Sequence, residues 1–135
     1  MSYGVAAALQ AAVWARLTGA AALTALVGGA VHDALPPGPV PQTWVAIGPE
    51  EVRDRSDRSG AGAEHEFTVS VVSAEAGFQT AKAVAGAVTD ALNGADLTLA
   101  RGRLVGLWFH RARARRLDDG AVRRIDVIFR ARTEE

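Results

Sequence analysis

The residues on either side of Asp118-Asp119-Gly120 constrain the fold of this chain more than any other stretch of its sequence. Apolar and polar residues alternate along both flanks, which is typical of two half-buried strands joined by a tight turn. Pairing Leu117 with Val122 fixes the register of the whole hairpin. The expected partners are then Ala114 with Ile125, Ala112 with Val127, and His110 with Phe129. These pairs form one apolar face, so we expect an antiparallel strand pair within residues 97–131.

The other face of this predicted hairpin is rich in arginine. It carries Arg111, Arg113, Arg115, Arg124 and Arg130, with Asp126 opposite Arg113 as its one carboxylate. A register shifted by one residue would place Arg113 against Ile125 and mix charge into the apolar side, so we prefer the first register. Guanidinium groups bind carboxylates and phosphates through paired hydrogen bonds. The arginine face is therefore either a solvated strand face or a surface for phosphates or an acidic protein partner.

Two further strands are expected earlier in the chain. Residues 64–73 form the clearest one, because His65, Phe67, Val69 and Val71 alternate with polar residues. Residues 44–47 read as a short strand, and the proline-rich residues 34–41 before it read as an extended connector. Residues 48–63 are polar and contain glycine and charges of both signs, which predicts a long exposed loop. Loops of that length often carry function, so this one is a candidate interaction element.

Apolar residues at helical spacing predict two main helices and a short one. Val5, Leu9, Val13 and Leu17 recur every four residues, and Ser2 is placed to cap that helix. We expect Thr18 to cap a shorter helix that carries Leu23, Leu26 and Val27 and ends at Gly28 and Gly29. We expect Ser73 to cap a helix that reaches about Asn93 and stops at Gly94. Its apolar stripe would be Phe78, Ala81, Ala85, Val88 and Leu92.

The order of these elements predicts the fold class. A helix, a short helix, two strands, a helix and a strand pair are typical of an α+β domain, here an antiparallel sheet with two main helices packed on one face. A chain of 135 residues has room for a single domain, so we expect one over residues 1–135. The second face and the edges of such a sheet stay uncovered, and neighbouring subunits would be a natural way to bury them.

The sequence offers no constellation for catalysis or for a cofactor. Cysteine is absent, which excludes disulfides, thiolate metal sites and cysteine nucleophiles. His32 with Asp33, and His65 between Glu64 and Glu66, lack metal-ligand geometry because successive strand residues point to opposite faces. No nucleophile elbow or phosphate-binding glycine loop is present. We therefore expect no enzyme activity, no metal and no cofactor.

Charge and hydropathy exclude two classes of partner. Fourteen arginines and one lysine balance fifteen acidic residues, so bulk attraction to nucleic acid or to an anionic membrane is not expected. The least charged run, residues 17–31, is shorter than the roughly 20 residues that a membrane-spanning helix needs. We expect a protein of the bacterial cytoplasm with no membrane partner.

Several sequence stretches are weak motifs singly but are informative together, through their order and spacing along the chain. They are LQAAVWARL at 9–17, LTALVGGAVHDALP at 23–36, PQTWVAIG at 41–48, EHEFTVSVVS at 64–73, the helix at 82–92 and FRAR at 129–132. The V-x-D-x-x-P pattern at Val31, Asp33 and Pro36 is the most distinctive. Taken together, the sequence resembles the tail terminator, or tail-completion, family of long-tailed bacteriophages. Within this family, the sequence resembles the gene transfer agent proteins of alphaproteobacteria.

The resemblance implies a structural protein that forms a ring, hexameric in relatives. Such a ring caps the tail tube, stops its polymerisation, joins the tail to a head connector or stopper protein, and lets DNA pass with transient, non-specific contact. The protein would assemble in the cytoplasm and end in the neck of a phage-like particle. The alternative function, argued from the arginine face alone, is a small nucleic-acid-binding module whose affinity falls steeply with salt.

Within such a ring, the exposed charged segment and the arginine face supply two groups of candidate contact residues. The candidate interface with the tube or with a neighbouring subunit comprises Glu50, Glu51, Arg53, Asp54, Arg55, Asp57 and Arg58. The candidates for the lumen or for ion pairs between subunits are Arg111, Arg113, Arg115, Arg124, Asp126 and Arg130.

Overall fold

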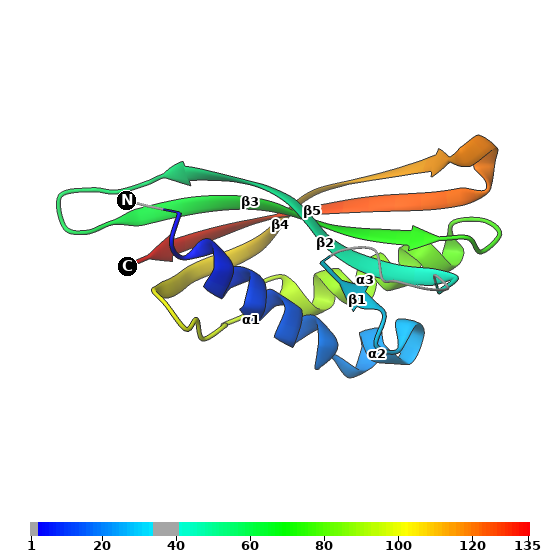
Figure 1. The fold of residues 1–135 in the computed structure, drawn as a ribbon, viewed down its shortest axis with the longest axis horizontal. Helices are drawn as coiled ribbons and strands as arrows, with labels where there is room; N and C mark the ends of the chain where they lie inside the picture. Colours follow the sequence, from blue (N-terminus) through cyan, green and yellow to red (C-terminus); the bar gives the residue numbers. More distant parts are fainter. Residues whose placement is uncertain (1–2, 34–40) are drawn as a thin grey trace.

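A computed structural model describes residues 3–33 and 41–135 of the chain. Within these ranges, five strands form one sheet in the order β1-β2-β3-β5-β4 (Figure 1). The strands are β1 (Val31–His32), β2 (Thr43–Asp54), β3 (Gly62–Ser73), β4 (Arg103–Leu117) and β5 (Val122–Glu134). All neighbours are antiparallel except β1, which pairs in parallel with β2. The predicted α+β class is confirmed, and the short parallel strand was not predicted.

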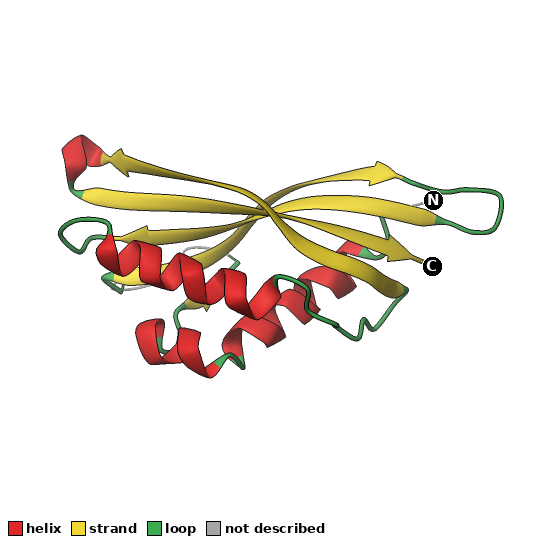
Figure 2. Ribbon diagram, turned by 180° about the vertical axis from the view of Figure 1, so that it is seen from behind, coloured by secondary structure: helices red, strands yellow, loops and turns green. Residues whose placement is uncertain are grey.

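The helices lie on one face of this sheet (Figure 2). They are α1 (Ala6–Thr18), α2 (Ala21–Val27) and α3 (Gln79–Leu92). The predicted stripe of α1 is confirmed, because Val5, Leu9, Val13 and Leu17 are all buried. In α3 the stripe is buried as predicted at Ala81, Val88 and Leu92, and Val84 joins it. Burial of these stripes against the sheet makes the core.

The predicted helix caps are not the observed ones. Ser2 lies outside the described residues, as does most of the connector at 34–41, and the residue that caps α1 is Val5. Thr18 is the last residue of α1, and Ala20 precedes α2. Ser73 ends β3, where its hydroxyl bonds to Thr43, so α3 starts only after Phe78. Pairing of Ser73 within the sheet outweighs its local capping preference.

The predicted loop over residues 48–63 is wrong. Strand β2 continues through this stretch to Asp54, and β3 already begins at Gly62, so only residues 55–61 connect them. A β-bulge between Ile47 and Glu50 accommodates Gly48 and Pro49, and pairing then resumes with Glu50 opposite Phe67. No described strand pairs with this part of β2 on its outer side, so the missing N–H of Pro49 costs no ladder hydrogen bond there.

The predicted register of the last hairpin is confirmed over its outer half. Leu117 pairs with Val122, Ala114 with Ile125, Ala112 with Val127, and Arg113 with Asp126. The pairing of His110 with Phe129 is wrong, because a bulge between Phe109 and Arg111 places Phe109 there instead. Ala112 and Ala114 are exposed although their partners are buried. The reason is that β4 is an edge strand, and α3 packs mainly against β3 and β5.

The sheet is long and twisted, and its two long hairpins end on opposite sides of the molecule (Figure 1). The turn between β2 and β3 projects at one end, and the turn at Asp118–Gly120 lies at the other. Of the described helices, none alone has the length and apolar composition to cross a membrane; only α1 and α2 together, bent by 75°, meet that test.

Candidate interaction surfaces

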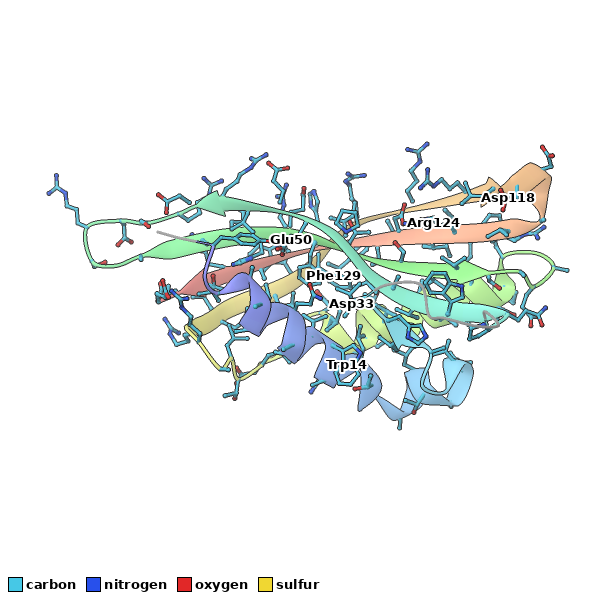
Figure 3. All side chains as sticks on the ribbon, in the orientation of Figure 1. Trp14, Asp33, Glu50, Asp118, Arg124 and Phe129 are labelled. Atoms are coloured by element: carbon cyan, nitrogen blue, oxygen red, sulfur yellow. The ribbon has the colours of Figure 1, made fainter. Side chains whose placement is uncertain are left out.

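The face of the sheet opposite the helices carries charged and polar side chains. Strand alternation puts Arg113, Asp126 and Ser70 in one row on this face, while Ile125 and Val127 point into the core. Figure 3 shows Arg124 and Asp118 near one end of the sheet and Phe129 beneath its middle. The amphipathic hairpin predicted from sequence therefore places its arginines on the uncovered face.

We call residues 111–126 the arginine end. It contains six arginines and three aspartates. Four of these arginines, together with Asp126, line a shallow depression that Pro49, Thr68 and Ile128 complete. They are Arg111, Arg113, Arg115 and Arg124. The depression combines residues of four strands, so only the folded sheet brings them together.

Asp126 organises part of the arginine end. Its carboxylate accepts hydrogen bonds from the Ser70 hydroxyl at 2.7 Å and from Arg124 Nε at 2.9 Å, and Arg115 Nη2 lies 3.3 Å away. Burial by itself would raise the pKa of Asp126, but the bonds from Ser70 and Arg124 and the charge of Arg115 outweigh it. The net pKa lies below the ordinary aspartate value, so Asp126 is ionised and holds two guanidinium groups in place.

The other predicted arginines divide into two kinds. Arg111 and Arg113 form no ion pair within the described part of the chain. Arg130 stands apart from the depression, with Nε 3.4 Å from a carboxylate oxygen of Glu66 and 3.6 Å from one of Glu64. The structure therefore groups five of the six predicted residues and leaves Arg130 with the neighbouring acidic region.

We call residues 50–66 the acidic arm, which is the hairpin formed by the end of β2, the turn and the start of β3. It contains six carboxylates and three arginines. Two ion pairs lie along it, Glu51 with Arg53 at 3.1 Å and Arg55 with Glu64 at 3.0 Å. All seven predicted contact residues, 50–58, lie in this arm, although most of them occupy a strand and not the expected loop.

The turn of the acidic arm has a defined structure. Asp54 accepts a hydrogen bond from the Ser56 hydroxyl at 2.6 Å, and Asp57 accepts one from Ser59 at 2.8 Å. These bonds stabilise the ionised forms and lower the pKa of both aspartates. Arg55 N donates to the Gly62 carbonyl at 2.8 Å, which closes the hairpin. A Cβ at Gly62 would lie 2.9 Å from the Arg55 carbonyl oxygen, so glycine is required at that point.

Sequence reasoning missed an exposed apolar segment on β4. Val105, Trp108 and Phe109 are 48%, 41% and 40% exposed. The sequence signal for this segment is the pair of adjacent aromatic residues, Trp108 and Phe109, which breaks the alternation expected of a strand. The described residues contain no group of three His, Asp or Glu side chains that could hold a metal ion.

Comparison with known proteins finds a family and solved structures that match this chain. The model of a family described as tail completion protein gp17 matches residues 11–134. A chain from a structure described as the virion of a native gene transfer agent particle is 62% identical to this one. The match covers 99% of this chain and 100% of that one, with a TM-score of 0.95. No curated protein matches the sequence.

Proposed function

Because this chain belongs to the tail completion protein gp17 family, we propose that it forms a ring that caps the tail tube of a phage-like particle. The ring ends tube polymerisation and joins the tail to the head connector or stopper protein, and DNA passes through its lumen. The observation that carries the proposal is the match over nearly the whole length to a chain of a gene transfer agent virion. The role is structural and needs no catalytic step.

The shape of the chain supports a ring. A closed ring needs two different surfaces on each subunit, so that each copy binds the next one head to tail. The acidic arm and the arginine end are two such surfaces, because they lie at opposite ends of one sheet and carry opposite charge. We propose that the protein assembles in the bacterial cytoplasm and that the finished ring sits in the neck of the particle.

The experiment that tests the proposal is the absolute mass of the purified protein by light scattering, across a concentration series, alone and with tail-tube protein. We expect a closed oligomer of ring size, hexameric as in relatives, either from the protein alone or once tube protein is present. A monomer that does not respond to tube protein would contradict the proposed function.

One observation favours a second candidate function. Arg111 and Arg113 have no carboxylate partner in the described part of the chain, which leaves them able to bind phosphates. If the protein is a nucleic-acid-binding module, the free protein should bind labelled DNA with an affinity that falls steeply as the salt concentration rises. If the protein is instead a ring subunit whose arginines contact protein carboxylates, the monomer should bind DNA only weakly.

A further inference from the structure

The acidic arm and the arginine end have mirrored charge. Residues 50–66 carry six carboxylates and three guanidinium groups, and residues 111–126 carry six guanidinium groups and three carboxylates. The chain as a whole has a formal net charge of zero, so the sheet is polarised along its length. Opposite potentials of this kind orient two molecules before they touch.

Each end also has charged groups that form no ion pair within the described chain. At the arginine end they include Arg111 and Arg113. In the acidic arm they include Asp54 and Asp57, which accept hydrogen bonds from serine hydroxyls and from backbone N–H groups. Arg113 lies level with Ala46 of β2, across β5 and β3, whereas Asp54 lies eight residues further along β2, so the two sets do not meet inside one copy. A contact between two copies brings them together.

The open edges of the sheet lie beside the same residues. In the described chain no strand pairs with the outer side of β4, nor with β2 beyond Ala46. Long exposed edges are normally protected or covered. Both edges here lie next to the charged ends, so one head-to-tail contact would cover an open edge on each copy.

From these observations we propose that the arginine end of one copy binds the acidic arm of the next copy. Arg111 and Arg113 meet the carboxylates around Glu51 and Asp54 across this contact. Repeated around a closed ring, it leaves neither end free. The proposal rests on the ring-forming function proposed above and identifies the surfaces through which the ring closes. It also assigns the arginine depression to the subunit interface and not to the lumen.

Two charge-reversal variants test this contact. Arg111→Glu with Arg113→Glu makes both ends of the molecule acidic, and Glu51→Arg with Asp54→Arg makes both ends basic. We expect each variant alone to lose the ring-sized species, since like charges then face each other at every contact. An equimolar mixture should regain that species, because acidic and basic copies can alternate around the ring. The matched controls are Lys82→Glu and Asp90→Arg, which reverse exposed charges on α3 and should assemble like the parent.

The readout is the mass by light scattering, alone and with tail-tube protein, for variants whose thermal unfolding stays within a few degrees of the parent. Variants that assemble like the parent, or folded variants whose mixture stays monomeric, would overturn the proposal while leaving the ring-forming function intact. A parent protein that stays monomeric even with tube protein would instead remove the proposed function, and this inference with it.

The absence of cysteine allows a second readout that does not depend on charge reversal. Asp54→Cys with Arg113→Cys places one thiol at each end of every copy, and a short bismaleimide then links neighbouring copies. We expect a ladder of covalent oligomers up to the ring size, whereas either single-cysteine variant should stop at a dimer. A double variant that also stops at a dimer, in a sample of ring mass, would contradict the contact.

Discussion

The Nε2 atom of His65 lies 2.9 Å from the hydroxyl oxygen of Thr133, and both side chains are fully buried between β3 and β5. The other ring nitrogen of His65 is buried and has no hydrogen-bond partner among the described residues. Burial lowers the pKa of His65 and outweighs the opposite effect of the nearby Glu50 carboxylate. The imidazole is therefore neutral in the folded protein near pH 7.

Because His65 is buried in its neutral form, we expect the free energy of unfolding to fall in mild acid. The unfolded chain takes up a proton on His65 below its ordinary pKa of 6.5, while the folded chain stays neutral until a lower pH. The free energy of unfolding should therefore decrease as pH drops from 7.5 to 5.5. Urea unfolding across that range measures the slope. His65→Gln should show a smaller slope than the parent, and equal slopes in the two proteins would contradict the account.

Phe129 is the second site at which stability can be predicted. It is fully buried at the centre of the sheet, stacked on Phe67 with ring centroids 5.6 Å apart. Phe129→Ala should cost about 3–5 kcal/mol of unfolding free energy, because it removes a buried ring and leaves a cavity. Phe109→Ala is the control, since Phe109 is 40% exposed and should cost clearly less. Equal losses in urea unfolding would show that the core does not centre on Phe129.

The register of the last hairpin shows what alternation in the sequence can predict. Ala114 opposite Ile125 follows from the polar and apolar pattern alone, because a slip of one residue reverses every side chain. The pattern does not show the bulge after Phe109, which adds one residue without disturbing alternation in the outer half. Nor does it show that the helices leave Ala112 uncovered, since that depends on tertiary packing.

In the acidic arm, by contrast, the local sequence pattern predicts the wrong secondary structure. Gly48 and Pro49 are local signals for the end of a strand, and the charges after them are typical of a loop. The structure keeps them in β2, because a bulge accommodates both residues and β3 supplies a partner on one side. The sequence therefore places the candidate contact residues 50–58 in a loop, whereas the structure puts residues 50–54 in strand β2.

The ion pairs of Asp126 at the arginine end should contribute to stability in a pH-dependent way. Its ion pairs with Arg124 and Arg115 are partly exposed, so Asp126→Asn should cost about 1–2 kcal/mol at pH 7. Because the pKa of Asp126 is lowered by folding, this contribution is present above the ordinary value of 3.8 and is lost as pH falls through the folded value. In urea unfolding, the difference in unfolding free energy between the parent and Asp126→Asn should therefore become smaller from pH 7 to pH 2.5. Asp90→Asn, exposed on α3, should stay within about 0.5 kcal/mol of the parent; a constant difference for Asp126→Asn would contradict the ion-pair account.

Two glycines are expected to respond to alanine with opposite sign. Gly102 has φ +72°, and a Cβ there would lie 2.7 Å from the Glu134 carbonyl oxygen. Gly102→Ala should therefore destabilise the fold by about 1–3 kcal/mol. Gly86 lies inside α3, and apart from the helix's own backbone no atom of the described residues lies within 4 Å of the place of its Cβ. Gly86→Ala should therefore stabilise by about 0.5–1 kcal/mol. Thermal unfolding of both variants measures this, and a destabilised Gly86→Ala would show that α3 packs differently.

The most direct test of the terminator function is the growth of tail tubes from purified tube protein, followed by electron microscopy with and without this protein. If the protein caps the tube, adding it should stop elongation and leave a ring at one end of each tube, and the charge-reversed variants should fail to stop growth until they are mixed. Tubes of unchanged length with no ring at either end would contradict the proposal.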